Sequence, residues 1–352
     1  MAVSFKKENK AFENWLRRRC KVVEADLAYK HKRMRKSAFV FLRATYFRWA
    51  KRIETICPEL KNAPRVLCVG DIHTENFGTW RDAQGRLVWG VNDFDEAANM
   101  PYAFDLVRLA ASASLAPNLR VGKKRAAAAI LRGYRAGLRA PRPTLLDEHE
   151  TRLRPFVVIT DQEREKFWQE VARYPQARPP GRVRRSLKNS LPAGATNVCF
   201  ASRVKGGGSL GRPRYVAIAE WSGGHILREA KAIVPSAWDW AHDAGHTRLR
   251  FLELSAGRFR SPDPFLTVKR GFVIRRIAAD SRKIDLGDDA GAKLKIGLLT
   301  AMGFDLAATH AATKGAARRI KRDLRSRRSG WLVAAAKAVA AAVQEDFEEW
   351  KG

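Results

Sequence analysis

The chain has 352 residues, of which 45% are hydrophobic, so it is long and apolar enough to form one large globular domain or two ordinary ones. Its formal net charge of +31 makes it a strongly basic protein, which attracts polyanions. The charge alone does not distinguish nucleic acid, anionic lipid and phosphorylated ligands as partners. The four cysteines, Cys20, Cys57, Cys68 and Cys199, have the spacing of neither a zinc site nor a disulfide framework, and no apolar signal segment opens the chain, so a cytoplasmic protein is expected.

The N-terminal part of the chain predicts helices followed by two strands. Helices are expected over residues 7–34 and 37–56, because apolar side chains recur there at three- and four-residue steps. Two short apolar strands follow, RVLCVGD (65–71) and LVWGVND (87–93), joined by TWRDAQGR with a turn at Ala-Gln-Gly. Both strands end in aspartate, which places two carboxylates at neighbouring strand ends.

Alanine- and leucine-rich segments predict further helices over residues 103–116 and 121–138, followed by a polar helical stretch to about residue 175. The segment RPPGRVRRSLK (178–188) contains Pro-Pro-Gly and is expected to be a loop or linker. The C-terminal helices include WLVAAAKAVAAAV, which is too short and too interrupted by Lys337 to predict a membrane span.

The middle of the chain predicts strands instead. The expected strands are TNVCFASRV (196–204), RYVAIAEW (214–221), HILREAKAIV (225–234), RLRFLEL (248–254) and GFVIRRI (271–277). The predicted fold class is therefore α+β, with a small antiparallel β-rich lobe (196–285) inserted into a helical lobe that is built from both chain ends (1–195 and 286–352).

The segment GDIHTENFG (70–78) concentrates polar side chains directly after a strand. Asp71 and Asn76 have the D-x-x-x-x-N interval of a kinase catalytic loop, in which the aspartate accepts the proton of the attacking hydroxyl and the asparagine binds a metal ion. Asp93, in VNDFDE, follows the next predicted strand and completes an oxygen-rich set suited to Mg²⁺. This interval alone is common by chance, and it is the pairing with Asn-Asp-Phe-Asp that gives it weight.

A metallohydrolase is a competing hypothesis for the same segments. Two metal ions could be bound by carboxylate, imidazole and amide groups, namely those of Asp71, His73, Asn92, Asp93 and Asp95. That chemistry needs further histidines, and the seven in the chain form no obvious second cluster.

The stretch KGGGSLGRPRYVAIAEW contains G-x-G-x-x-G at Gly206, Gly208 and Gly211, with Ser209 between the last two. A strand, not a helix, follows these glycines, which favours a kinase-type phosphate-covering loop in a β-hairpin over a dinucleotide-binding fold. Lys231 on the next strand takes the place of a kinase lysine that holds α- and β-phosphates. A simple glycine-rich turn with an exposed lysine is the competing interpretation.

These motifs, with MRKSAFVFLRATYF upstream and REAKAIVPS downstream, resemble the bacterial family called domain of unknown function 2252, from about residue 30 to the C-terminus. They are also similar to aminoglycoside and choline kinase-like phosphotransferases, which carry HGD-x-x-x-x-N, IDF-G-D and P-x-x-x-D-L, the last matched by PYAFDL. The resemblance implies that Asp71 is the catalytic base, that Asn76 and Asp93 bind Mg²⁺, and that Asp105 supports the loop.

The order of these motifs implies a circularly permuted protein-kinase-like fold. In the kinases the glycine loop, the lysine and a helix ending in histidine precede the catalytic loop, whereas here they follow it, and the helix resembles GFDLAATHAA with His310. Val69 replaces the histidine before the Gly-Asp pair, so either His73 orients the loop or nothing does. Asp95 replaces the glycine of Asp-Phe-Gly and either adds a metal ligand or marks altered chemistry.

The resulting functional hypothesis is an ATP- and Mg²⁺-dependent phosphotransferase with an unidentified hydroxyl acceptor. Arg275 and Arg276 are expected either to steady anionic groups or to be surface charge, and the glutamate that pairs with Lys231 is unidentified, since Glu229 is too near in the strand and Glu253 is a guess. These gaps leave a pseudokinase and a nucleotidyl transferase open. A basic protein that binds nucleic acid or other polyanions through its +31 charge is the alternative from another class.

Overall fold

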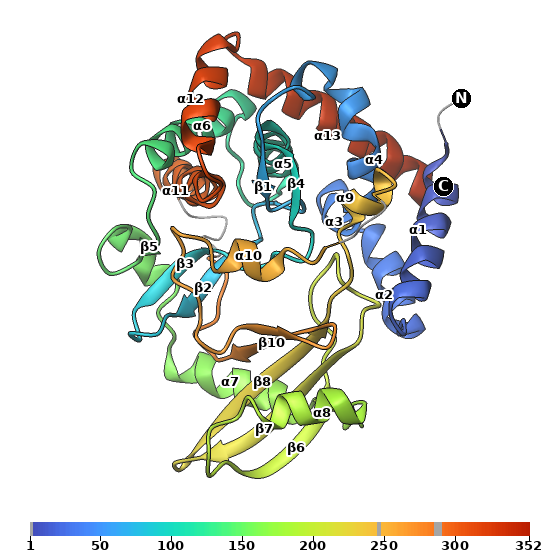
Figure 1. Cartoon of the computed structure of the whole chain (residues 1–352), viewed down its shortest axis with the longest axis vertical. Helices are drawn as coiled ribbons and strands as arrows, with labels where there is room; N and C mark the ends of the chain where they lie inside the picture. Colours follow the sequence, from blue (N-terminus) through green and yellow to red (C-terminus); the bar gives the residue numbers. More distant parts are fainter. Residues whose placement is uncertain (1–2, 245–247, 285–290) are drawn as a thin grey trace.

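The structure is a computed structural model, which describes residues 3–244, 248–284 and 291–352. Most of its helices gather at one end of the molecule, and a five-stranded sheet with two helices forms the other (Figure 1). The helices of the larger, helical lobe are α1 (Phe5–Arg19), α2 (Glu24–Met34), α3 (Ala38–Ala44), α4 (Tyr46–Ile56), α5 (Tyr102–Leu115), α6 (Lys123–Arg139), α11 (Ala292–Ala311), α12 (Ala316–Ser326) and α13 (Trp331–Lys351). The α+β class with small antiparallel sheets is therefore confirmed.

Tertiary contacts divide the two N-terminal helices that the periodicity predicts. Between α1 and α2, the backbone N–H of Val23 donates to the carbonyl of Gly211 (2.8 Å), so the break is fixed by the glycine-rich loop far along the chain. Between α3 and α4, the Thr45 hydroxyl donates back to the carbonyl of Phe41 (2.8 Å), and α3 begins with the Ser37 hydroxyl accepting from Val40 N–H. Apolar periodicity alone does not report such breaks.

The two predicted N-terminal strands do not pair with each other. β1 (Arg65–Cys68) pairs with β4 (Ala98–Pro101), whereas β3 (Leu87–Val91) lies between β2 (Phe77–Arg81) and the short β5 (Thr144–Leu145). The turn at Ala-Gln-Gly exists, with Gly85 at φ +76°, but it closes the β2–β3 hairpin. The prediction of neighbouring strands was wrong because β2, which begins inside the polar motif, was not recognised.

The second lobe is an antiparallel sheet in the order β6-β7-β8-β10-β9. Its strands are β6 (Thr196–Ser202), β7 (Arg214–Trp221), β8 (Gly224–Ala232), β9 (Thr267–Lys269) and β10 (Phe272–Ile277). Ser222 and Gly223, at φ +48° and +77°, form the tight turn between β7 and β8. The segment 248–254 was expected to be a strand, but it forms part of α10 (Phe251–Ser255), whose buried Phe251 and Leu254 have helical spacing.

Two helices accompany this sheet. Val183 and Leu187 of α8 (Gly181–Lys188) pack on the face that carries Ala217, and Val171 of α7 (Asp161–Ala172) packs on the face that carries Val216. The expected loop over 178–188 is therefore wrong from residue 181 onward, because an apolar pair one turn apart anchors a helix there. The structure groups α7 and α8 with the sheet, although they precede residue 196; the expected boundary at 285/286 falls outside the described residues.

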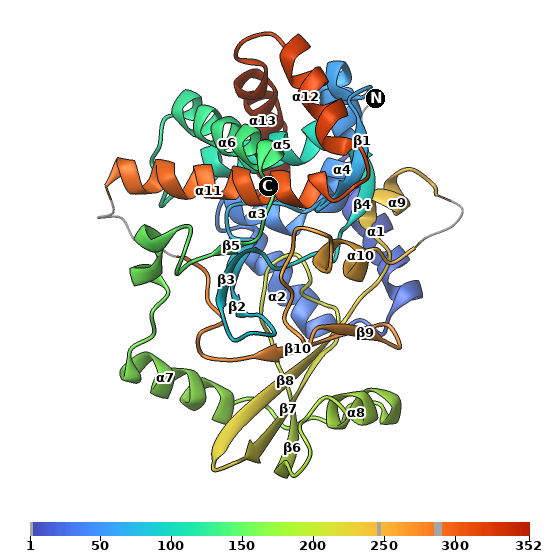
Figure 2. The same cartoon turned by 60° about the vertical axis from the view of Figure 1, so that its left-hand side comes forward.

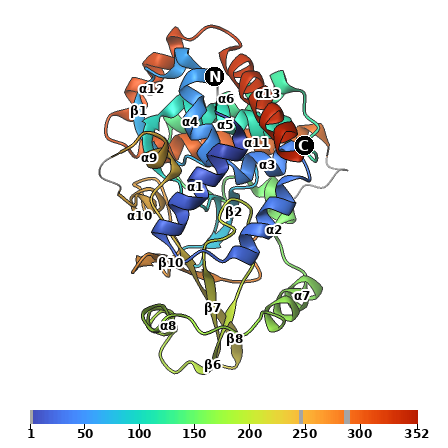
Figure 3. The ribbon, with the colours of Figure 1, turned by 90° about the vertical axis from the view of Figure 1, so that its right-hand side faces the viewer.

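Segments from both ends of the chain complete the helical lobe. α6 and α11 lie side by side (Figure 2), so close that a Cβ on Gly133 would stand 1.8 Å from the carbonyl oxygen of Thr300. α1 and α13 are neighbours (Figure 3), where the backbone N–H of Phe5 donates to Glu349 Oε2 (3.0 Å). Within the described ranges, no helix is both long and apolar enough to span a membrane.

Candidate functional site

A cavity of about 710 Å³ is lined by residues of both the helical lobe and the sheet lobe. The predicted site residues that line it are Asp71, His73, Asn76, Asp93, Asp95, Gly206, Gly208 and Ser209. Gly211 and Lys231 lie outside its lining. Ten basic and six acidic residues line the cavity, so its walls carry an excess of positive charge.

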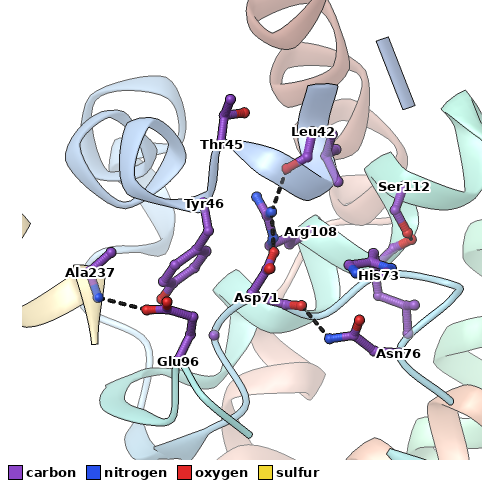
Figure 4. Close-up of polar contacts among 12 residues, drawn as sticks. Leu42, Thr45, Tyr46, Asp71, His73, Asn76, Glu96, Arg108, Ser112 and Ala237 are labelled. Carbon is purple, nitrogen blue, oxygen red and sulfur yellow. Dashed lines mark hydrogen bonds and ion pairs between the residues drawn. The ribbon is translucent and has the colours of Figure 1, made fainter. Parts of the chain in front are cut away.

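Asp71 reaches the cavity because the chain turns sharply at the residue before it. Gly70 has φ +82°, and a Cβ there would stand 2.2 Å from the carbonyl oxygen of Glu96, so no larger residue fits. The Asp71 carboxylate is paired with Arg108 of α5, whose Nε donates to Asp71 Oδ1 (3.1 Å) (Figure 4). The Asp71 side chain stays 18% exposed, which leaves it open to a ligand.

Arg108 is fully buried and is held by two aromatic rings and by hydrogen bonds through Nε and Nη2, while its Nη1 has no hydrogen-bond partner among the described residues. Its guanidinium carbon lies 5.1 Å and 5.2 Å from the ring centroids of Tyr46 and Trp49, and its Nη2 donates to the Leu42 carbonyl (2.8 Å). Burial raises the pKa of Asp71 to about 7, although Arg108 acts in the opposite direction. Arg108 was not predicted, although it lies three residues after Asp105, on the same face of α5.

The rest of the polar loop holds itself in shape. The Asn76 side-chain nitrogen donates to the Asp71 carbonyl (2.5 Å), so its amide oxygen is the group left for a metal ion (Figure 4). His73 Nδ1 accepts from the Glu75 backbone N–H (3.2 Å). Burial, together with Arg43 and Lys283, lowers the pKa of His73 well below its usual value, so the imidazole is neutral. The contact of His73 that is seen in the loop is thus this one hydrogen bond from Glu75.

Asp93 and Asp95 differ in what they offer the cavity. Lys231 Nζ lies 3.1 Å from Asp93 Oδ1 and 2.8 Å from Asp95 Oδ1. Burial opposes ionisation of Asp93, but Lys231 and Arg275 outweigh it and lower the pKa of this carboxyl, which remains 42% exposed. Asp95 is 6% exposed and also paired with Arg212 (3.3 Å), so Asp93 is the better placed metal ligand. Lys231, 2% exposed, is buried behind both.

The loop stands on a fully buried network beneath it. Asp105 accepts from the backbone N–H groups of Val69 (2.7 Å) and Gly70 (3.0 Å), and His310 Nε2 lies 3.0 Å from Asp105 Oδ2. The Tyr134 hydroxyl meets His310 Nδ1 at 2.7 Å. Cys68 lies close enough to Asp105 and His310 to form a metal site, but both carboxylate oxygens and both ring nitrogens already have partners. The network is therefore a support for the loop.

The glycine-rich loop between β6 and β7 reaches across to the helical lobe. The Gly206 carbonyl accepts from Arg33 Nη1 (2.7 Å), and a Cβ on Gly208 would stand 2.9 Å from the Arg43 carbonyl oxygen and 3.1 Å from Asp71 Oδ2. A glycine at 208 thus lets the backbone lie against the Asp71 carboxylate. Gly211 instead packs on Leu27 outside the cavity.

Arginines cluster on the cavity face of the sheet, and of these only Arg275 was singled out from the sequence, whereas its neighbour Arg276 lies outside the cavity lining. The fully buried carboxylate of Glu229 contacts Arg203 (2.6 Å), Arg214 (3.1 Å) and Arg275 (2.7 Å). Arg275 lies directly opposite Glu229 across the β10–β8 pair, so strand alternation could have indicated this contact. Glu253 pairs instead with Arg250 near the surface (3.1 Å), so the guess that it partners Lys231 was wrong.

The comparison with protein families covers the first part of the site. Residues 19–179 match the model of a family described as an uncharacterized protein conserved in bacteria (DUF2252). The chain resembles that family over this range, which holds GDIHTENFG, NDFDE and α5 but ends before the sheet, short of the C-terminus to which the resemblance was expected to extend. No curated protein and no solved structure matches the chain.

Proposed function

We propose that the protein is an ATP- and Mg²⁺-dependent phosphotransferase with a kinase-like fold, acting on a hydroxyl acceptor. The observation that carries this proposal is the convergence of Asp71, Asn76 and Asp93 with a glycine-rich β-hairpin loop around one cavity. The buried contact of Asp105 with the loop backbone and with His310 also fits the permuted kinase order, since these segments are far apart in sequence.

The residues present fit a magnesium nucleotide in part. Asp93 supplies an ionised, half-exposed carboxylate and Asn76 an amide oxygen, which are the hard oxygen ligands that Mg²⁺ takes. Asp95 fits less well, because it is buried between Lys231 and Arg212. When bound, Mg²⁺-ATP supplies the phosphoryl group and neutralises its charge.

Asp71 is the general base, which takes the proton of the acceptor hydroxyl. Its raised pKa of about 7 makes it a better base than an ordinary aspartate, yet one that is largely ionised above neutral pH. Arg108 holds one carboxylate oxygen, which leaves the other to accept the proton of an acceptor hydroxyl. Gly208, against that carboxylate, keeps the approach free of side-chain atoms.

Thermal unfolding with and without Mg²⁺-ATP tests the nucleotide site. A ligand at a hundred times its dissociation constant stabilises the fold by about 2.7 kcal/mol, so the wild type is expected to gain stability only when both ATP and Mg²⁺ are present. Asp93→Ala should lose that gain, and Asp161→Ala, whose side chain is 97% exposed, should keep it. A nucleotide that stabilises neither the wild type nor the control contradicts the proposal.

Turnover separates the base from the binding groups. Asp71→Asn keeps the shape of the side chain and its place beside Arg108, but it cannot take a proton. We expect phosphoryl transfer, or hydrolysis of ATP by water in its stead, to fall by about 10²- to 10⁴-fold while the Mg²⁺-ATP stabilisation is kept. Equal loss of turnover and of nucleotide binding argues against the role of a base.

Polyanion binding is the second candidate, favoured by the net charge of +31 and the excess of basic groups around the cavity. Its signature is a steep loss of affinity for nucleic acid with rising salt and no sequence preference. Competition by Mg²⁺-ATP would place both ligands in the same cavity, whereas independent binding would assign the polyanion to the outer surface.

A further inference from the structure

The cavity face of the sheet carries its positive charge in three arginines gathered around one carboxylate. Arg203 follows β6, Arg214 begins β7 and Arg275 lies on β10, so three strands contribute to the cluster. All three arginines line the cavity, whereas Glu229 itself is completely buried. The cluster thus presents guanidinium groups to the cavity and keeps its single carboxylate behind them.

The arginines are rigid before any ligand arrives. Arg203 Nη1 donates to Glu229 Oε2 (2.6 Å) and its Nε donates to the Tyr174 hydroxyl (3.0 Å). Arg214 donates through Nη1 to Glu229 (3.1 Å) and through Nη2 to the Ser209 hydroxyl of the glycine-rich loop (3.1 Å). These contacts fix the planes of the side chains, so a ligand meets groups whose conformational entropy is already lost.

These contacts leave some N–H donors of the arginines unused and leave a net positive charge on the cluster. Each arginine uses two of its nitrogens, Nε and Nη2 in the case of Arg275, and a guanidinium group carries several further N–H donors. Three positive charges face one negative charge. Asp93, which also interacts with Arg275, is paired with Lys231 (3.1 Å), so the cluster keeps a surplus of positive charge toward the cavity.

Lys231 is in a different situation. It lies directly opposite Arg214 across the β7–β8 pair, but its ammonium group is 2% exposed and held between Asp93 and Asp95. A ligand would have to break two ion pairs to reach it. Arg275 needs no such change, since it already exposes a quarter of its side chain, whereas Arg203 and Arg214 reach the cavity with 9% and 7% of their side chains exposed.

We propose that Arg203, Arg214 and Arg275, positioned by Glu229, bind consecutive phosphate groups in this cavity, and that Lys231 orders the two carboxylates and does not touch the ligand. The inference rests on the proposed function, which supplies a polyphosphate to bind, and it assigns that binding to a different set of residues. Planar guanidinium groups suit this task because they bind phosphate oxygens through paired hydrogen bonds.

Isothermal titration of the whole protein with inorganic tripolyphosphate, without Mg²⁺ and at constant ionic strength, tests the assignment. Arg275→Gln is expected to weaken binding by about 10- to 100-fold, the loss for hydrogen bonds to a charged group. The matched control is Arg276→Gln, which removes the same charge from the next residue of β10, on the other face of the sheet, and should change the affinity less than about threefold. Lys231→Gln leaves Asp93 beside Arg275 without its ammonium partner, so it should weaken binding, but less than Arg275→Gln does.

Arg275→Lys covers the case in which the glutamine variant does not fold. It keeps the charge but loses the fork, so an intermediate loss of affinity is expected. Equal weakening by Arg275→Gln and Arg276→Gln would reduce the effect to general electrostatics and overturn the proposal. So would loss of binding in Lys231→Gln alone, or failure of tripolyphosphate to bind the wild type.

The two proposals fail in different ways. Tripolyphosphate binding that depends on Arg275, in a protein that never turns over ATP, leaves the arginine site standing and removes the phosphotransferase. If Arg275→Gln and Arg214→Gln turn over Mg²⁺-ATP with an unchanged KM, the phosphotransferase stands and the arginine site is removed.

Discussion

Two carboxylates that lie behind the lining of the cavity, one in each lobe, are buried to the same extent and have opposite surroundings. Asp105, in the helical lobe, accepts from two backbone N–H groups and from His310. Each of these donors makes its hydrogen bond to Asp105 and has none left for a ligand. Glu229, in the sheet, is surrounded by three arginines that keep unused donors and unused charge. Both side chains have no exposed area.

The comparison teaches that burial of a charged group does not by itself distinguish a support from a binding site. What distinguishes them is whether the partners are satisfied once the pair has formed. The partners of Asp105 are satisfied, so removing it should damage the fold. The arginines around Glu229 keep unused donors, so replacing Glu229 should change the binding of an anionic ligand more than it changes the fold.

The largest expected effect is that of Asp105→Ala on stability. The substitution leaves the N–H groups of Val69 and Gly70 and the ring of His310 without their acceptor in a dry interior. We expect the free energy of unfolding in urea to fall by about 3–5 kcal/mol. Asp161→Ala, at an exposed site, should leave the urea midpoint unchanged. A small loss in Asp105→Ala would mean that the loop does not need this support.

Glu229→Gln should lower the free energy of unfolding by less, about 1–3 kcal/mol, because the amide oxygen still accepts hydrogen bonds. Burial disfavours the ionised carboxylate, but the arginines outweigh it and hold the pKa of Glu229 well below its usual range. Its stabilisation is thus present above the unfolded pKa of about 4.3 and disappears as the pH falls toward the folded value. The stability gap between wild type and variant should therefore be widest near neutral pH and narrow below about pH 4.

Tripolyphosphate sharpens the contrast between the two carboxylates. In Glu229→Gln the arginines repel one another without compensation, so added tripolyphosphate should raise the melting temperature of this variant more than that of Asp105→Ala. An equal rise in both variants would contradict the distinction between a support and a binding site.

Asp71 is intermediate, since one carboxylate oxygen is paired with Arg108 and the side chain stays partly exposed. If Asp71 is the base, activity should fall about tenfold for each pH unit below its pKa of about 7. The pH profile of kcat/KM is the measurement that checks this. The raised pKa also means that, between about pH 4 and 7, the folded state keeps a proton on Asp71 that the unfolded state has lost, so the contribution of Asp71 to stability should decline as the pH rises through that range. Asp71→Asn should remove that decline.

Local patterns predicted much of this molecule. The strands β7, β8 and β10 followed from β-branched alternation. Asp71 and Asp93 both line the cavity, although the two strands that were expected to place them side by side belong to different sheets. The missing parts depend on contacts between distant segments. β2 was hidden inside a polar motif, and α8 was concealed by Pro-Pro-Gly, which ends just where that helix begins.

The same limit applies to the site. Lys231 was expected at the phosphates because its place in the sequence fits, but its environment is set by Asp93 and Asp95 from the other lobe. Arg108 likewise gains its role from Tyr46 and Trp49, which lie on α4. A pattern of residues in one segment carries no information on which distant group neutralises a charge.

The composition of the helical lobe from both ends of the chain has a consequence for biosynthesis. α13 packs against α1, α3, α4 and α5, so the N-terminal helices lack part of their core until the last helix leaves the ribosome. The strands of the sheet, by contrast, all lie within 196–277, so the whole sheet can emerge before α12 and α13 do. The nascent chain thus exposes apolar faces of its first helices throughout most of translation, which is the period when chaperones have a surface to bind.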